Sequence, residues 1–229
     1  MSIEEFFGDW SKVIDLKEAE RVTRRLASSN ISLCPRLKDI FKAFTLCPLN
    51  ELKVVILGQD PYNNVNASNN PVATGIAFAN SPDTSKERFS PSLEKLSESF
   101  IDYTVPHRTV IFDPSLEKLE AQGVLLLNAA LTCEQGKANS HSLLWRPFMR
   151  TLLKNLSNYH SNIVYVLMGS TAQAYEIFID SKHNKVFHIR HPSWYARTDT
   201  RMPSDIWSEV NKYIFGQYGT EIEWYQELK

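Results

Sequence analysis

The stretch Lys53–Tyr62, KVVILGQDPY, decides the fold of this 229-residue chain. Its apolar residues follow one another without polar alternation, which is typical of a strand buried on both faces of a parallel sheet. Three further apolar runs end, as this one does, in polar or turn-forming residues. The four expected strands are Leu52–Leu57, Val124–Leu127, Ile163–Met168 and Val186–Ile189. Together they predict a central four-stranded parallel sheet.

Segments of helical character lie between these runs and favour an α/β fold in which helices flank the sheet. They are Ser2–Ser28, which opens on a Ser2/Glu5 capping box, Arg36–Phe44, Ser92–Phe100, Phe148–Leu156 and Ser170–Phe178. Two stretches, Asn63–Pro91 and Thr132–Pro147, lack periodicity, so we expect long functional loops there. Because 43% of the residues are hydrophobic and no linker divides the chain, we expect one domain over residues 1–229.

The composition argues against several classes of protein. Lys and Arg number 25 against 26 Asp and Glu, so affinity for a polyanion would need a local basic surface. Three scattered cysteines without a C-x-x-C pair predict neither a disulfide framework nor a metal site, and we expect no cofactor. No apolar run approaches the roughly 20 residues of a membrane span, and the N-terminus is not a secretory signal. We therefore expect an intracellular protein without membrane association.

Polar residues follow each of the four expected strands. Asp60 comes after the first, Asn128 after the second, Gly169-Ser170 after the third and His191 after the fourth. In an open parallel sheet, ligands bind outside the carboxyl ends of the strands. Taken singly, these residues read equally well as turn, cap or packing residues. Their conjunction predicts a site for one small, planar, hydrogen-bonding ligand.

These same residues carry a resemblance to a known family. The stretch Lys53–Tyr62 resembles the water-activating motif of family 1 uracil-DNA glycosylases, and His191-Pro192-Ser193 resembles the start of their DNA-intercalation loop. Further similar stretches are GIAFAN (75–80), PSLEKL (91–96), GVLLLNAALT (123–132), ANSH (138–141) and VLMGSTAQ (166–173). The resemblance covers nearly the whole chain. It implies a base excision repair enzyme that flips uracil out of DNA and hydrolyses the N-glycosidic bond, leaving an abasic site.

Two related groups of glycosylases fit the sequence less well. Enzymes that resemble the mismatch-specific or single-strand-selective types have Asn where this chain has Asp60, and the iron–sulfur type needs four cysteines.

In the family 1 reading, the carboxylate of Asp60 positions the attacking water and stabilises the sugar cation. His191, held neutral, donates a hydrogen bond to the uracil oxygen that gains charge. The resemblance thus implies that Asp60 and His191 are catalytic.

The resemblance also implies a set of uracil-binding residues. Asn128 pairs with N3–H and O4 of the base, a pattern that cytosine cannot satisfy in the same orientation. Tyr62 blocks the C5 position and so excludes the methyl group of thymine. Phe78 stacks on the flipped base, although a phenylalanine in an apolar run is as often plain core. Gln59 contributes mainly through its backbone.

Three loops are expected to grip the DNA backbone with small residues. The expected DNA-binding residues are Pro91, Ser92, Gly169, Ser170, Pro192, Ser193 and Tyr195. Around the last loop, residues 182–201 contain five Lys and Arg against one acid, Asp199. A solvated loop explains such a cluster equally well, but its position beside the HPS motif favours a DNA-binding surface.

The chain departs from the family pattern at three places, one of which is the stretch near Trp145, where it is one residue shorter and has Phe148-Met149-Arg150 in place of the usual FTD. Asn63 replaces the usual His after GQDPY, and Trp194-Tyr195 replaces the usual Pro-Leu after HPS. By position, Tyr195 is the expected wedge that fills the gap left by the flipped base. The expected partners are uracil-containing single- and double-stranded DNA and inhibitor proteins that mimic DNA, and the protein is expected to be a monomer. It would be cytoplasmic in a bacterium, and nuclear or in the host cell for a eukaryotic or viral source.

Two other classes of function compete with this reading. A non-catalytic DNA-binding subunit would need neither Asp60 nor Asn128 nor His191. A nucleotide-binding or phosphate-binding α/β protein would normally contain G-x-G-x-x-G or G-x-x-x-x-G-K, and the chain contains neither.

Overall fold

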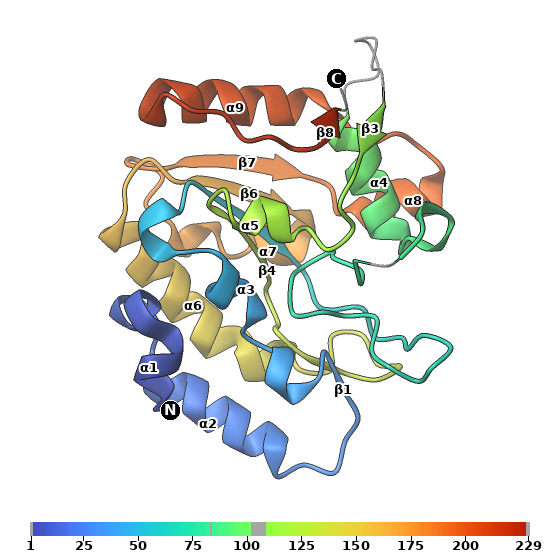
Figure 1. Ribbon diagram of the computed structural model, residues 1–229. Helices are drawn as coiled ribbons and strands as arrows, with labels where there is room; N and C mark the ends of the chain where they lie inside the picture. Colours follow the sequence, from blue (N-terminus) through green and yellow to red (C-terminus); the bar gives the residue numbers. More distant parts are fainter. Residues whose placement is uncertain (1, 83, 102–108, 228–229) are drawn as a thin grey trace.

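The four expected strands form one parallel sheet with the order β4-β2-β6-β7 (Figure 1). Their observed bounds are Val54–Gly58 for β2, Val124–Asn128 for β4, Val164–Met168 for β6 and Lys185–Ile189 for β7. Each boundary lies within two residues of its predicted position. The computed structural model describes residues 2–82, 84–101 and 109–227. It confirms an α/β domain whose sheet is flanked by helices.

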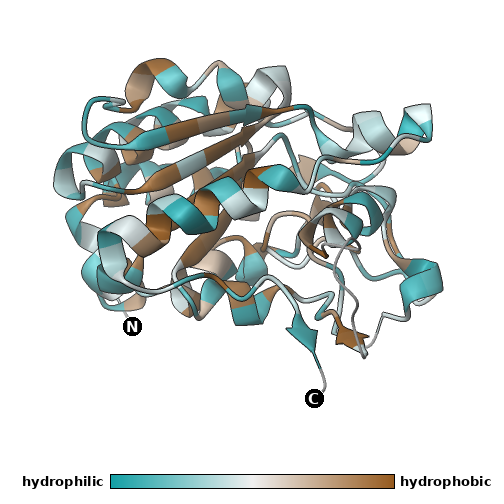
Figure 2. Ribbon diagram, turned by 90° about the horizontal axis from the view of Figure 1, so that it is seen from above, coloured by the Kyte–Doolittle hydropathy of each residue, from teal (hydrophilic) through white to brown (hydrophobic). Residues whose placement is uncertain are grey.

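Alternate residues of the central strands enter two separate hydrophobic cores. Val55, Leu57 and Tyr165 belong to the core that also contains Trp145 of α6, whereas Ile56 belongs to the opposite core. Figure 2 shows the brown, hydrophobic strands between helices that are partly brown and partly teal. Because β2, β4 and β6 are buried at every position, their sequences are apolar without interruption.

Helices cover both faces of the sheet. The first core packs α1 (Ile3–Phe7), α2 (Leu16–Ala27), α3 (Lys42–Leu46), α6 (Ser142–Tyr159) and α7 (Gly169–Gln173). The second packs α4 (Pro91–Phe100), α5 (Glu117–Glu120), α8 (Pro192–Thr198) and α9 (Asp205–Tyr218). Figure 1 shows α6 and α9 on opposite sides of the sheet. Two short pairs complete the fold, β1 (Leu33–Cys34) with β5 (Cys133–Glu134) and β3 (Val110–Ile111) with β8 (Gln226–Glu227).

The N-terminal segment Ser2–Ser28 is not one helix, which corrects the sequence prediction. The Ser2/Glu5 capping box is present and starts α1, but the chain leaves the helix at Gly8, which has φ +52°. A second helix then starts at Asp15, whose carboxylate accepts from the N–H of Glu18. Periodicity continues across the break, whereas the two caps fix its position.

The expected loop Thr132–Pro147 also ends earlier than predicted. Helix α6 begins at Ser142 and contains Pro147. Pro147 is the sixth residue of α6, so the helix lacks the hydrogen bond to the carbonyl of Leu143 that another residue would donate there. The opposite face of the helix is buried in the first core, which holds the helix together across this position. The prediction treated this proline as a helix boundary, which was wrong because the helix begins at Ser142 and continues through it.

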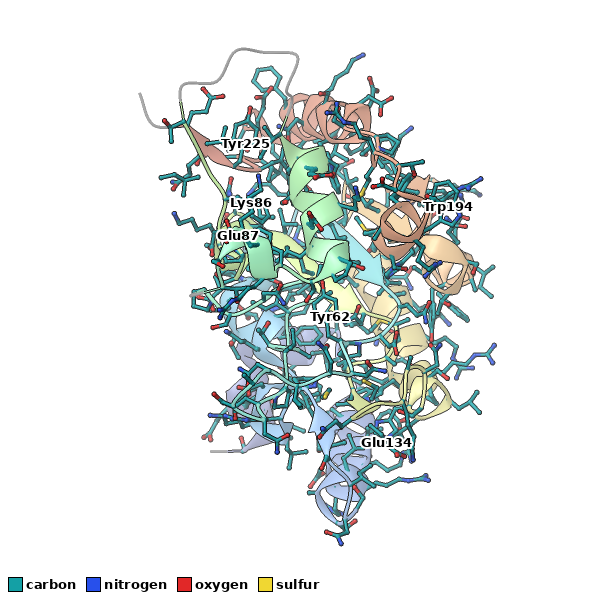
Figure 3. All side chains as sticks on the ribbon, turned by 90° about the vertical axis from the view of Figure 1, so that its right-hand side faces the viewer. Tyr62, Lys86, Glu87, Glu134, Trp194 and Tyr225 are labelled. Atoms are coloured by element: carbon teal, nitrogen blue, oxygen red, sulfur yellow. The ribbon has the colours of Figure 1, made fainter. Side chains whose placement is uncertain are left out.

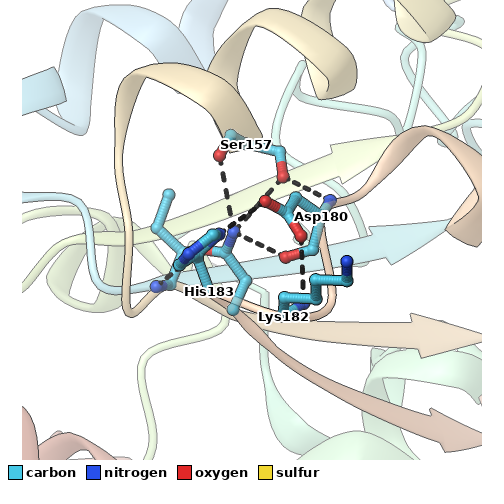
Figure 4. A network of polar contacts seen from close by, with 6 residues as sticks. Ser157, Asp180, Lys182 and His183 are labelled. Atoms are coloured by element: carbon cyan, nitrogen blue, oxygen red, sulfur yellow. Dashed lines mark hydrogen bonds and ion pairs between the residues drawn. The ribbon is translucent and has the colours of Figure 1, made fainter.

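A polar network joins α6 to the amino-terminal ends of β6 and β7, opposite the strand ends that carry the motif residues (Figure 4). The Ser157 hydroxyl accepts from the backbone N–H of Asp180 at 2.6 Å and from the Asn184 amide at 3.2 Å. Asn184 in turn accepts from the N–H of Ile163, just before β6, at 3.0 Å. His183 contacts the Asp180 carboxylate at 2.6 Å, which helps to lower the pKa of that carboxyl. The network therefore fixes where β6 and β7 start.

Glu120 of α5 forms a hydrogen bond with β4, which is an edge strand of the four-stranded sheet. Its side chain is fully buried, and one carboxyl oxygen accepts from the N–H of Leu126 in the edge strand β4 at 3.0 Å. The other oxygen has no hydrogen-bond partner among the described residues. Burial raises the pKa of this carboxyl well above its ordinary value of 4.5, although the N–H of Leu126 acts in the opposite direction.

Replacing Glu120 with Gln is expected to stabilise the protein at pH 8 and to have progressively less effect toward pH 4.5. The folded state keeps the Glu120 proton in a range where the unfolded chain releases it, so the wild type loses stability as pH rises, whereas Gln does not titrate. Urea unfolding at several pH values measures the difference in free energy. A difference that did not change with pH would show that Glu120 is ionised in the fold.

Candidate active site

The carboxyl ends of the four parallel strands open into one cavity of about 670 Å³. The expected site residues that line it are Gln59, Asp60, Tyr62, Phe78, Ser92, Asn128, Gly169, Ser170, His191 and Ser193. They come from all four strand ends, from the long loop 63–91 and from the start of α4. The volume lies within the range typical of small-molecule sites.

Gly58, the last residue of β2, provides the space in which two of these side chains lie. It pairs in register with Asn128 of β4. A Cβ atom on Gly58 would come within 2.6 Å of the Asn128 side-chain oxygen and 2.7 Å of the Phe78 ring. Only glycine leaves room for the Asn128 amide and the Phe78 ring to lie beside each other. The sequence analysis did not identify Gly58 as a site residue, although the motif contains it.

Asp60 is held from one side by the loop after β5. Its Oδ2 accepts from the backbone N–H of Asn139 at 2.7 Å, and the Gln59 side chain donates to Asn139 Oδ1 at 2.9 Å. Burial raises the pKa of Asp60, while the hydrogen bonds from Asn139 and Gln59 lower it in part. One carboxylate oxygen, Oδ2, is thus fixed by the backbone N–H of Asn139.

His191 is a neutral imidazole in a defined tautomer. The backbone N–H of Ser193 donates to its Nδ1 at 3.2 Å, and the Ser193 hydroxyl lies 2.9 Å from the same atom. Nδ1 is therefore an acceptor, and the ring proton is on Nε2. Burial, with a contribution from the Arg197 charge, lowers the pKa of His191 to about 4. At neutral pH the ring presents one N–H donor and no positive charge.

Tyr62 and Phe78 form an aromatic wall of the cavity. The Tyr62 hydroxyl donates to the Phe78 carbonyl at 2.8 Å, and burial raises the pKa of Tyr62. Phe78 has φ +67°, a backbone conformation that bulky side chains seldom adopt. Its ring centroid lies 5.6 Å from that of His191. Such strain commonly marks functional sites, because the surrounding structure must hold it in place.

The expected DNA-binding residues divide into two groups. Ser92, Gly169, Ser170 and Ser193 line the cavity. Gly169 has φ +84°, and a Cβ there would lie 2.9 Å from that of His191. Pro91 is exposed at the first position of α4 outside the cavity lining, and Pro192 is buried at the start of α8.

Tyr195, the wedge expected from the sequence, does not line the cavity. The Tyr195 side chain is only 7% exposed and packs in the second core. Residues 192–198 form a helix, so Trp194 and Tyr195 point about 100° apart around its axis. Trp194 is the member of the pair that lines the cavity. Counting positions along the motif could not reveal which of the two faces the core.

The rim around Trp194 is cationic. The Arg190 guanidinium lies 4.1 Å from the Trp194 ring centroid, and Arg197 donates to the Ser193 hydroxyl at 3.2 Å. Both arginines line the cavity. Figure 3 views this side of the molecule, with Tyr62 near the middle and Trp194 on α8. Part of the basic segment 182–201 therefore reaches the site.

Among residues 2–82, 84–101 and 109–227, no group of three or more His, Cys, Asp or Glu side chains could hold a metal ion. Within the same residues, no helix is long and apolar enough to cross a membrane.

The arrangement of the cavity lining suits an uncharged planar ring attached to an anion. An amide, a neutral imidazole and an aromatic ring line the cavity, together with two arginines. Fold and site together define a nucleobase-binding α/β enzyme.

Comparisons with known proteins specify this class further. The model of the uracil DNA glycosylase superfamily matches residues 44–215. The crystal structure of mimivirus uracil-DNA glycosylase is similar with a TM-score of 0.75 and 21% identity over 98% of this chain and 93% of that one. A mimivirus variant in complex with UGI has a TM-score of 0.79 at 21% identity, covering 98% and 88%. The enzyme from Nitratifractor salsuginis has a TM-score of 0.56 at 19% identity, covering 87% and 91%.

The chain belongs to the uracil DNA glycosylase superfamily, because the family model covers most of its length, including all four strands of the sheet. It is accordingly a glycosylase of the hydrolase class that acts on DNA and excises uracil in base excision repair.

Substituting Gly58 with Ala is expected to lower uracil excision by roughly tenfold or more, because the new methyl group must displace the Asn128 amide or the Phe78 ring. Excision from a single-uracil oligonucleotide measures the effect. Gly216→Ala is the matched control, since no atom of another described segment lies within 4 Å of a Cβ there. Equal activity of the two variants would show that the two side chains can move apart without consequence.

Proposed function

We propose that this protein is a family 1 uracil-DNA glycosylase in which Asp60 acts on the sugar side, and His191 on the base side, of the bond that breaks. The observation that carries the proposal is one cavity lined by an anchored carboxylate, a neutral imidazole and an amide. Hydrolysis breaks the bond between deoxyribose C1′ and uracil N1. The bonding electrons leave with the base, and water adds to C1′.

Asp60 and His191 each stabilise one of the two charges that develop as the bond breaks. The sugar becomes cationic, and the carboxylate of Asp60 stabilises it and orients the attacking water. The departing uracil becomes anionic, and the Nε2–H of His191 donates to its oxygen. A neutral donor suits this role because the pKa of about 4 keeps His191 uncharged at working pH.

Four residues would select uracil. The Asn128 amide pairs with N3–H and O4, and Phe78 stacks on the ring. Tyr62, whose hydroxyl is fixed on the Phe78 carbonyl, presents a rigid edge at C5 and excludes thymine. Gln59 anchors Asn139 with its side chain, a role that adds to the expected backbone contribution.

The DNA backbone would be gripped by Ser92, Gly169, Ser170 and Ser193, with Pro91 and Pro192 shaping the loops in which these residues lie. Trp194 is proposed as the wedge in place of Tyr195. Its ring lies at the cavity and is backed by Arg190, so it can enter the stack when the base leaves. Filling the gap offsets the few kcal/mol that unstacking and unpairing cost.

The proposed substrates are uracil-containing single- and double-stranded DNA, bound by a monomer. Proteins that mimic DNA are proposed as inhibitors, because a variant of the similar mimivirus enzyme was crystallised with UGI. A surface that grips phosphates would also bind a protein carrying carboxylates at similar spacing.

Asp60→Asn is expected to reduce uracil release by at least about a hundredfold while leaving DNA affinity within a few-fold, because the substitution removes the charge but keeps the shape. Alkaline cleavage of a single-uracil oligonucleotide measures release, and fluorescence anisotropy measures binding. The wild-type protein is the positive control. Absence of cleavage by the wild type on either strand form would refute the glycosylase assignment, and an equal loss of binding and release would make Asp60 structural.

Trp194→Ala is expected to slow excision from duplex DNA by roughly tenfold and to affect single-stranded DNA much less, because stacking on a base is worth about 1–3 kcal/mol. Rates on matched single- and double-stranded substrates give the ratio. Tyr195→Ala serves as the comparison: it should lower stability by about 3 kcal/mol through lost core packing. A duplex-selective loss in Tyr195→Ala and none in Trp194→Ala would restore Tyr195 as the wedge.

A further inference from the structure

The loop that follows β4 is joined to the Asp60 loop along most of its length. The backbone N–H groups of Ala129 and Ala130 donate to the carbonyls of Gly58 and Gln59 at 3.1 and 3.0 Å. Farther along, the N–H of Gly136 donates to the Asn63 carbonyl at 2.7 Å. Cys133 adds a weak thiol hydrogen bond to the Pro61 carbonyl at 3.5 Å. These four hydrogen bonds hold the Asp60 loop in place, and residues 129–139 are called the template loop below.

Asn139 is the point at which this template reaches the carboxylate itself. It has φ +61°, in the left-handed region, and this conformation directs its N–H at Asp60 Oδ2 across 2.7 Å. Its own side-chain oxygen accepts from Gln59 at 2.9 Å. Asn139 is exposed, so its place is set by these contacts and not by burial. Asparagine tolerates the left-handed region better than other residues with a Cβ.

We propose that Asn139 is a positioning residue for Asp60: its left-handed backbone aims the N–H at one carboxylate oxygen, and Gln59 holds it in that conformation. The inference rests on the proposed function of Asp60. Fixing Oδ2 orients the whole carboxylate toward the cavity in which the water and the sugar would lie. The hydrogen bond also favours the charged form of Asp60 against the desolvation that opposes it.

Several other titratable groups face Asp60. The buried thiol of Cys133 lies close enough for the Asp60 charge to contribute to its raised pKa of about 12. Tyr62, His191, Arg190 and Arg197 line the same cavity. At neutral pH the thiol, phenol and imidazole are uncharged, so the two arginines are the charged side chains that share the cavity with Asp60. A change in Asp60 titration on altering Asn139 alone can therefore be assigned to the lost hydrogen bond.

Three variants separate backbone conformation from side-chain tethering. Asn139→Ala disfavours the left-handed backbone and should lower kcat by roughly tenfold or more with little change in KM. Asn139→Gly keeps the N–H and accepts the left-handed region freely, so kcat should recover to within a few-fold of wild type. Gln59→Ala removes the tether and should give an intermediate kcat.

The pH profile gives a second readout with a definite sign. Loss of the hydrogen bond raises the pKa of Asp60, so in Asn139→Ala the acid limb of kcat should move to higher pH. A ¹³C NMR titration of the Asp60 carboxyl in the DNA-free protein should show the same upward shift. This measurement needs no activity, so it tests the inference even if uracil excision fails.

Asn162→Ala is the matched control, because Asn162 has φ +67° at the entry side of β6, away from the cavity. It should lower the melting temperature about as much as Asn139→Ala while leaving kcat and the Asp60 titration unchanged. Equal kcat losses in Asn139→Ala and Asn139→Gly, with an Asp60 pKa that does not move, would overturn the proposal. So would a loss confined to KM, which would make Asn139 a DNA-binding residue.

Discussion

The structure depends on the parallel, in-register pairing of β2 with β4 and β6. Gly58 is opposite Asn128, and Leu57 is opposite both Leu127 and Leu167, so the strands end at one edge of the sheet. Buried backbone groups must be paired, and the ladder satisfies them while it fixes the relative height of the strand ends. A shift of one residue would turn every side chain of a strand to the opposite core and would separate Asn128 from the space that Gly58 provides.

Burial at this edge has opposite effects on the two groups proposed to be catalytic. Desolvation disfavours charge, so it raises the pKa of Asp60 and lowers that of His191. For His191 the result is a neutral donor, which the proposed reaction needs. For Asp60 the result alone would oppose the reaction, and the N–H of Asn139 counteracts it. The hydrogen bond from the template loop thus offsets part of the effect of desolvation on the pKa of Asp60.

Much of the fold could be predicted because burial leaves a direct trace in sequence. The strands read as unbroken apolar runs, and polar residues that follow all four of them line the cavity. Two predictions failed for reasons of geometry. Gly8 and Asp15 split an N-terminal helix whose periodicity continued across the break, and Pro147 lies inside a helix whose buried face packs in the core on both sides of the proline. By count, Tyr195 holds the wedge position of the family motif, whereas Trp194 is the member of the pair that lines the cavity, because residues 192–198 form a helix that turns Tyr195 toward the core.

The sequence by itself determined the sheet, the superfamily and the identity of the polar groups at the strand ends, because these follow from local composition and short motifs. Only the tertiary structure decided how the groups are held. Asp60 and Asn139 are separated by 79 positions, and no local pattern links them. The need for glycine at position 58 arises from side chains on another strand and another loop. Contacts between distant segments depend on the packing of the whole domain, and for that reason a single sequence does not reveal them.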